Sequence, residues 1–97
     1  MSKGYWITAY RAVHDLTALT EYAKLAGPAI EAGGGRFLVR NNAARAFEEG
    51  VNERTVVIEF ESVERAVATY ESPAYQRALV TLYGAVERDV RIVEGVP

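Results

Sequence analysis

The stretch ESPAYQ at residues 71–76 decides the second half of the fold, because it marks the start of a helix. Ser72 can cap free backbone N–H groups of the first turn, and Pro73 stands where its missing N–H costs nothing. Apolar residues then recur at helical spacing, which predicts a helix from Pro73 to about Glu87. The run RIVEG at residues 91–95 predicts a last strand over 90–94 that ends at a glycine.

Apolar periodicity predicts the elements that precede this helix. Asp15 and Ser62 are each expected to cap a helix, and Pro28 predicts a kink in the first helix or a break after Gly27. The expected elements are strands over 5–13, 36–40 and 55–60, a helix over 16–32 and a shorter helix after residue 62. The order strand, helix, strand, strand, helix, strand predicts a ferredoxin-like α+β sandwich with helices on one face of an antiparallel sheet and strand order 4-1-3-2.

Two connections in this pattern need a specific interpretation. The triplet Gly33-Gly34-Gly35 predicts a helix stop rather than a phosphate cradle, because phosphate loops run from a strand into a helix N-terminus. The segment between the second and third strands is long for a compact domain. We expect residues 43–48 to prolong the second strand past a bulge near Asn41-Asn42, with the turn at residues 50–53.

Composition narrows the class of protein. The 97 residues suit a single domain over 1–97, and a 49% apolar, 25% charged composition is typical of a globular chain. A net charge of −2 gives no basic footprint for nucleic acid. The chain has no cysteine, which excludes disulfides and thiol nucleophiles, and no apolar run approaches the roughly 20 residues that span a bilayer. We therefore expect a cytoplasmic protein without nucleic-acid or membrane partners.

Alternation along the strands predicts a second subunit. One face of the sheet is apolar and should lie under the helices. The opposite face is mixed rather than polar, with the residues Arg36, Leu38, Arg40, Thr55, Val57, Glu59, Arg91 and Val93. A solvated face is usually more polar than this, and a small domain has no further element to cover it. A homodimer through the sheet faces is the expected partner arrangement.

At this point the chain resembles a known family, the domain-of-unknown-function family 1330. The resemblance rests on the order and spacing of GYWI at 4–7, GGRFLVR at 34–40, VIEF at 57–60, SPAYQ at 72–76 and IVEG at 92–95. It implies the dimeric α/β-barrel version of the ferredoxin-like fold, in which two sheets face each other. It implies little about activity, because the family has no established one.

Charged side chains mark two candidate binding places at opposite ends of the sheet. Arg36 and Glu59 lie on one face of neighbouring strands and form either an ion pair in the dimer or the polar end of a pocket. Arg40, Asn41 and Arg54 lie at the other end. Two arginines and an amide can hold a carboxylate, and the alternative is a solvated loop cluster.

His14 and Tyr75 complete the candidate ligand-binding residues. His14 is the single histidine, so one chain cannot supply a two-histidine metal site. It is either a general base or an exposed loop residue. Tyr75 suits a pocket or an interface because its ring is apolar and its hydroxyl forms hydrogen bonds, although packing explains its position equally well. We predict neither a metal nor a cofactor, and assign no catalytic residue.

The sequence favours a protein that binds a small anionic or aromatic molecule, with a cofactor-independent enzyme as a variant of that hypothesis. The alternative is a non-catalytic, stress-type interaction module whose dimer is its function. A haem-handling role is a third hypothesis, for which His14 is poorly placed because a proximal ligand should lie on a pocket wall.

Overall fold

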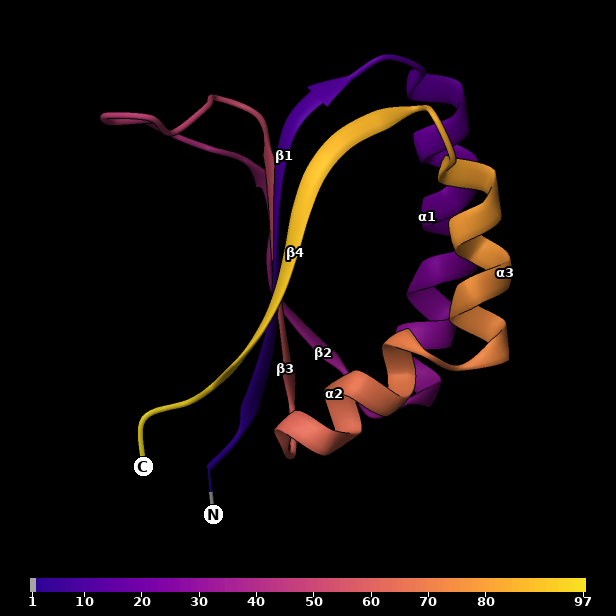
Figure 1. Cartoon of the computed structure of the whole chain (residues 1–97), viewed down its shortest axis with the longest axis vertical. Coiled ribbons are helices and arrows are strands. Elements are labelled where there is room, and N and C mark those ends of the chain that lie inside the picture. The colour runs from indigo at the N-terminus through magenta and orange to yellow at the C-terminus, as the bar shows by residue number, and fades with distance from the viewer. Residues whose placement is uncertain (1) are drawn as a thin grey trace.

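The computed structural model describes residues 2–97 and forms a four-stranded antiparallel sheet with three helices on one face (Figure 1). The sheet order is β2-β3-β1-β4, which confirms the ferredoxin-like α+β fold. In chain order the elements are β1 (Gly4–Val13), α1 (Leu16–Ala32), β2 (Arg36–Asn42), β3 (Arg54–Phe60), α2 (Val63–Tyr70), α3 (Pro73–Leu82) and β4 (Val86–Glu94). Within residues 2–97, no helix is long and apolar enough to cross a membrane.

The predicted caps hold the three helix starts. The Asp15 carboxylate accepts a hydrogen bond from the Ala18 amide at 3.0 Å. Ser62 and Ser72 accept from amides three residues on, at 3.1 and 3.2 Å. These bonds satisfy N–H groups that have no partner within the helix.

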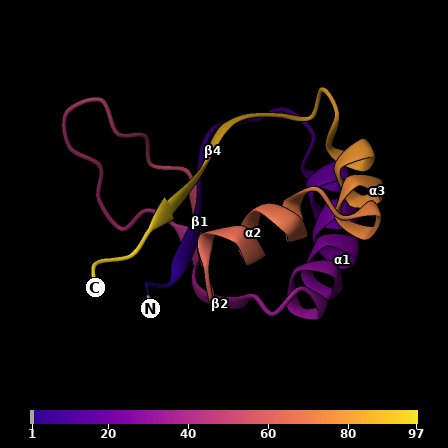
Figure 2. The ribbon, with the colours of Figure 1, turned by 60° about the horizontal axis from the view of Figure 1, so that its bottom comes forward.

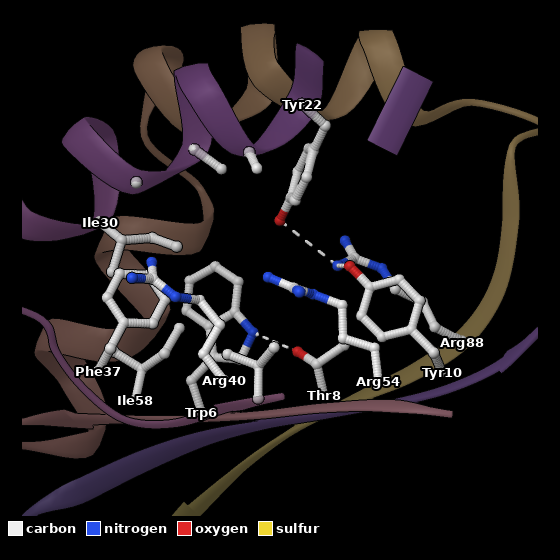
Figure 3. Close-up of a pocket in the computed structure, with 14 residues that line it drawn as sticks. Trp6, Thr8, Tyr10, Tyr22, Ile30, Phe37, Arg40, Arg54, Ile58 and Arg88 are labelled. Atoms are coloured by element: carbon white, nitrogen blue, oxygen red, sulfur yellow. Dashed lines mark hydrogen bonds between the residues drawn. The ribbon is translucent and has the colours of Figure 1, made fainter. Parts of the chain in front are cut away.

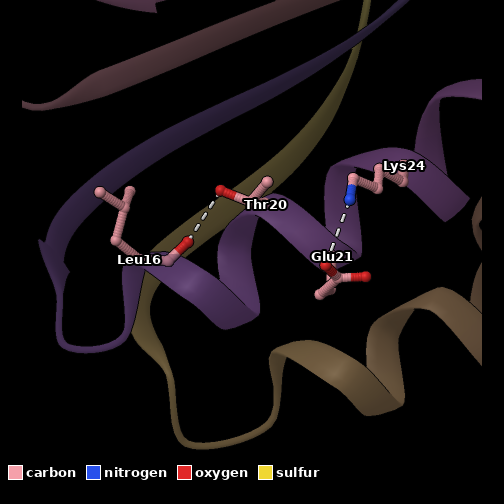
Figure 4. A network of polar contacts seen from close by, with 4 residues as sticks. All are labelled: Leu16, Thr20, Glu21 and Lys24. Carbon is pink, nitrogen blue, oxygen red and sulfur yellow. Dashed lines mark hydrogen bonds and ion pairs between the residues drawn. The ribbon is translucent and has the colours of Figure 1, made fainter.

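Helix α1 runs unbroken through Pro28, so the predicted break after Gly27 is wrong. Ala26, Ala29 and Ile30 are buried around the proline, and this packing keeps the helix continuous despite one lost backbone hydrogen bond. The outer face of α1 is solvated. There Thr20 donates to the Leu16 carbonyl at 3.0 Å and Lys24 pairs with Glu21 at 3.3 Å (Figure 4).

Large aromatic side chains form the core between the sheet and the helices. Trp6, Phe60 and Tyr75 are among the largest fully buried side chains. The Trp6 ring meets the Tyr75 ring edge to face, with centroids 4.8 Å apart. The first strand and the ESPAYQ helix start are therefore joined directly.

The end of α3 and the start of β4 differ from the sequence prediction. Helix α3 ends at Leu82 rather than near Glu87, because Gly84 takes a left-handed backbone conformation with φ +75° and turns the chain. Strand β4 therefore begins at Val86, four residues before the predicted start. Arg88, which lay between the predicted helix and the predicted strand, lies within this strand.

Strand β2 carries its bulge earlier than predicted. Phe37 pairs with Ile58 and Val39 pairs with Val57, so Leu38 is an extra residue that has no partner on β3. The bulge reverses the faces of Val39 and Arg40. Val39 joins the uncovered face, and Arg40 turns to the face that carries the helices, opposite to the prediction for both.

The segment 43–53 does not prolong β2, which ends at Asn42. This loop projects from the sheet on the side away from the helices (Figure 2). Phe47 in the loop is 73% exposed, so no apolar partner within residues 2–97 holds the predicted strand extension in place.

Candidate functional site

A small pocket lies between α1 and the helix-covered face of the sheet (Figure 3). Its floor is formed by Trp6 and Thr8 of β1 with Val56 and Ile58 of β3. One wall is the segment 22–30 of α1. The cavity is small: the centre of a water molecule can occupy about 40 Å³ of it, which is room for about three waters. Only a compact ligand, or one end of a larger one, fits this space.

Arg88 closes one end of the pocket with three tyrosine hydroxyls. Its Nη1 donates to Tyr10 at 3.2 Å and to Tyr22 at 3.4 Å, and its Nη2 donates to Tyr75 at 3.0 Å. The Tyr22 and Tyr75 hydroxyls are themselves 2.7 Å apart. The guanidinium carbon also lies 5.5 and 5.2 Å from the ring centroids of Tyr10 and Tyr22. We call these four residues the Arg88 cluster.

The Arg88 cluster carries an unbalanced positive charge. Burial raises the pKa of Tyr75 far above its ordinary value of 10.0, and the adjacent Tyr22 adds to this rise. Burial likewise raises the pKa of Tyr10. The guanidinium stays protonated at any physiological pH, whereas these two hydroxyls stay neutral. None of the ion pairs among residues 2–97 includes Arg88.

Arg40 and Arg54 line the opposite end of the pocket. Arg40 pairs with Val56 and Arg54 pairs with Asn42, which places both arginines on the helix-covered face of adjacent strands. The Arg40 guanidinium lies 4.2 Å from the Phe37 ring centroid, and the Arg54 side chain points into the pocket (Figure 3). Neither arginine forms an ion pair within residues 2–97. The pocket lining includes no aspartate, glutamate or histidine among the described residues.

The structure brings some of the predicted site residues together and separates others. Arg40 and Arg54 line one pocket, but this pocket lies on the helix-covered face and not on the mixed face predicted for Arg40. Asn41 does not join them, because it pairs with Thr55 on the uncovered face and its side chain accepts from the Asn42 amide at 2.8 Å. Tyr75 lies behind the pocket, fully buried, and reaches the site through Arg88.

The remaining candidates lie outside the pocket. Arg36 and Glu59 form an ion pair at 3.2 Å on the uncovered face, where Tyr5 also donates to Glu59 at 3.0 Å. His14 lies 2.8 Å from a carboxylate oxygen of Glu87, and both side chains are exposed. Among residues 2–97, no group of three or more acidic, histidine or cysteine side chains is arranged to hold a metal ion.

Comparison with known proteins places this chain in a family. The model of a domain of unknown function, DUF1330, matches residues 3–96. The chain belongs to the DUF1330 family. No curated protein matches the sequence.

Solved structures share the fold of this DUF1330 chain at low sequence identity. A protein of unknown function from Rhodopseudomonas palustris is 16% identical, with a TM-score of 0.78 over 99% of this chain and 84% of that one. A protein from Nitrosomonas europaea, provisionally named an antibiotic biosynthesis monooxygenase, is 17% identical, with a TM-score of 0.65 over 98% and 99%. A dimeric ferredoxin-like protein of unknown function from Bacteroides fragilis is 11% identical, with a TM-score of 0.64 over 95% of each chain.

Sequence reasoning missed the Arg88 cluster of this DUF1330 chain. The signal was present in the alternation of β4, where Arg88 shares its face with Val86, Val90 and Ile92. An arginine among inward-facing apolar residues must find polar partners. The misplaced end of α3 hid this pattern, because Arg88 fell between the predicted helix and the predicted strand.

Proposed function

We propose that this chain binds a small anionic molecule in the pocket between the sheet and α1, with an anionic oxygen held by the Arg88 cluster. The observation that carries this proposal is a half-buried guanidinium that contacts three tyrosine hydroxyls and no carboxylate. A cation withdrawn from water without a counter-ion costs free energy. A bound anion supplies the missing counter-ion.

Hydrogen-bond accounting supports the same proposal. Each tyrosine hydroxyl carries one proton to donate. The bond between Tyr22 and Tyr75 uses one of their two protons. The other, and the proton of Tyr10, have no side-chain acceptor among residues 2–97, because the remaining contacts of these hydroxyls come from Arg88. The cluster therefore has more donors than acceptors, which suits a carboxylate, a phosphate or an enolate oxygen.

The pocket supports binding better than catalysis. Its described lining offers no carboxylate or histidine to serve as a general base near neutral pH. The cofactor-independent enzyme variant draws its support from fold-level likeness to proteins with provisional monooxygenase names, which is a weaker argument than the chemistry of a site.

A homodimer through the uncovered sheet face is part of this proposal. Leu38, Val39 and Val93 on that face are each 45 to 46% exposed, an apolar surface that a second copy would bury. Structural neighbours from Bacteroides fragilis and Thermobifida fusca are described as dimeric, which favours the same assembly here. The pocket lies on the opposite side of the sheet, so such a dimer would leave it accessible.

A thermal-shift screen tests the proposed ligand class. The panel pairs butyrate with butyramide and benzoate with benzamide, so that each anion has a neutral counterpart of similar shape. A ligand at about 100 times its dissociation constant adds about 2.7 kcal/mol to the free energy of unfolding, a shift of about 10 °C or more for a domain of this size.

Variants assign a thermal shift to the pocket. We expect Arg88→Met to abolish the anion shift, and Arg77→Gln, which removes an exposed arginine on α3, to keep it. Equal shifts from the amides, or a shift that survives in Arg88→Met, would contradict the proposal. A flat screen would instead favour the interaction module, in which the dimer itself is the function.

A further inference from the structure

Strand register places Arg54 and Arg88 in one row across the sheet. Ala9 pairs with Thr55, so the next positions along the two strands are Tyr10 and Arg54. Tyr10 also pairs with Arg88 on the other side of β1. Since neighbouring strands lie about 4.8 Å apart, the Cα atoms of the two arginines are separated by about 10 Å. Tyr10 stands between them.

Both guanidinium groups face the same small space. Arg88 reaches it between the rings of Tyr10 and Tyr22, and Arg54 enters it from the β3 side above the floor (Figure 3). Two cations that share a small, partly buried pocket repel each other more strongly than they would in open water. Arg40 adds a third positive charge beside Arg54, held against the Phe37 ring.

The floor between the two cationic ends offers little polar recognition. The Trp6 indole N–H donates to the Thr8 hydroxyl at 3.0 Å, so this donor is already used, and the Thr8 hydroxyl proton is the one polar donor left on the floor. Val56 and Ile58 provide the rest of the floor. A ligand that spans the pocket therefore needs an apolar middle and a charged oxygen group at each end.

We infer that the ligand is a small dicarboxylate, with one carboxylate at the Arg88 cluster and the other between Arg54 and Arg40. This inference rests on the proposed function and names its ligand class. Three arginines without carboxylate partners match two carboxylates better than one. The free space of about 40 Å³ restricts the ligand to a short carbon chain. Each carboxylate accepts charge-assisted hydrogen bonds, and guanidinium groups bind carboxylates through paired N–H donors.

Isothermal titration calorimetry at constant ionic strength tests the second carboxylate. The probes are succinate and glutarate, with monomethyl succinate and butyrate as single-charge counterparts. We expect the dicarboxylates to bind at least about tenfold more tightly than either monoanion. Arg54→Gln should remove this advantage, because it weakens the dicarboxylates much more than butyrate, whose single carboxylate is held by the Arg88 cluster. Arg77→Gln serves as the control for lost surface charge and should keep the advantage.

The outcomes separate the inference from the proposed function. If monomethyl succinate binds as tightly as succinate, or if Arg54→Gln retains the dicarboxylate advantage, the second subsite does not exist, whereas the proposed anion site stands. If none of the four anions binds, both the dicarboxylate inference and the proposed function are wrong. Circular dichroism confirms that Arg54→Gln is folded, and Arg40→Gln repeats the test from the adjacent strand.

Discussion

The Nη2 atom of Arg88 lies 3.0 Å from the hydroxyl of Tyr75, and this bond joins the last strand to the helix start that decides the fold. Tyr75 lies in the first turn of α3, where its amide is capped by Ser72. The residues that start the helix thus also position the cation at the end of the pocket. Stability and the candidate site depend on the same tyrosine.

Removing the Tyr75 hydroxyl is expected to destabilise the protein. Tyr75→Phe keeps the ring in the core but deletes the acceptor of Arg88 and the partner of Tyr22. Loss of one partner of a buried hydrogen bond costs about 1–3 kcal/mol. Urea unfolding monitored by circular dichroism measures the change. The matched control is Tyr83→Phe, because Tyr83 is 94% exposed and its hydroxyl should contribute nothing. Equal stabilities of the two variants would contradict the role given to Tyr75.

Removing the Arg54 charge is expected either to leave the stability of the unliganded protein unchanged or to raise it. Arg54 has no ion-pair partner within residues 2–97 and shares the pocket with two other arginines. Binding sites often reduce the stability of the free protein in this way. Arg54→Gln should change the free energy of unfolding by about 0 to +1 kcal/mol, more at low salt than at high salt. A loss of more than about 1 kcal/mol would mean that Arg54 has a structural role instead.

Stability is expected to fall at alkaline pH because of the buried tyrosines. Burial raises the pKa of both Tyr10 and Tyr75 in the folded state. The unfolded chain therefore releases these protons first, at about pH 10, and the folded state loses free energy relative to it as the pH rises further. The stabilisation from these groups is complete below that pH. Urea unfolding between neutral pH and about pH 11 should show a decline that is shallower in Tyr75→Phe. If the free energy of unfolding declined equally with pH in the wild type and in Tyr75→Phe, the result would contradict the burial of the Tyr75 hydroxyl.

The substitution Gly84→Ala tests the turn that sets the start of β4, and Gly27→Ala provides the comparison. Gly84 has φ +75° and open space around its missing Cβ, so Gly84→Ala adds backbone strain without a clash. A cost of about 1–2 kcal/mol is expected. Gly27 lies within α1 and also has open space, so Gly27→Ala should stabilise by about 0.5–1 kcal/mol through helix propensity. Thermal unfolding compares the two, and a Gly84→Ala variant as stable as wild type would contradict the turn.

A charge on the uncovered sheet face is expected to dissociate the proposed dimer. Val93 is 46% exposed on that face, and a face-to-face dimer would withdraw the new carboxylate of Val93→Asp from water at a cost in free energy. Val80→Asp provides the control, because Val80 is 75% exposed on α3. Size-exclusion chromatography with light scattering should give a monomer for the first variant and a dimer for the second. A monomeric wild type would contradict the proposed assembly.

The sequence predicted the fold because each of its signals is local. The caps at Asp15, Ser62 and Ser72, together with strand alternation, determine element order, and the order determines the sheet. The site depended on two finer features. A bulge at Leu38 has no sequence signature strong enough to place it, yet it turns Arg40 from one face to the other. The turn at Gly84 had a signature, but the apolar spacing of Leu79, Leu82 and Val86 continued past it and extended the predicted helix.

The most direct test of the anion site is the NMR signal of the Arg88 side chain. The Nε–Hε resonance of Arg88 can be assigned by its loss in Arg88→Met and followed during titration with succinate, with neutral succinamide as the control. We predict a saturable shift of this resonance with succinate and none with succinamide. An Arg88 resonance that stays in place at saturating succinate, or that shifts equally with succinamide, would contradict the assignment of Arg88 as the anion-binding residue.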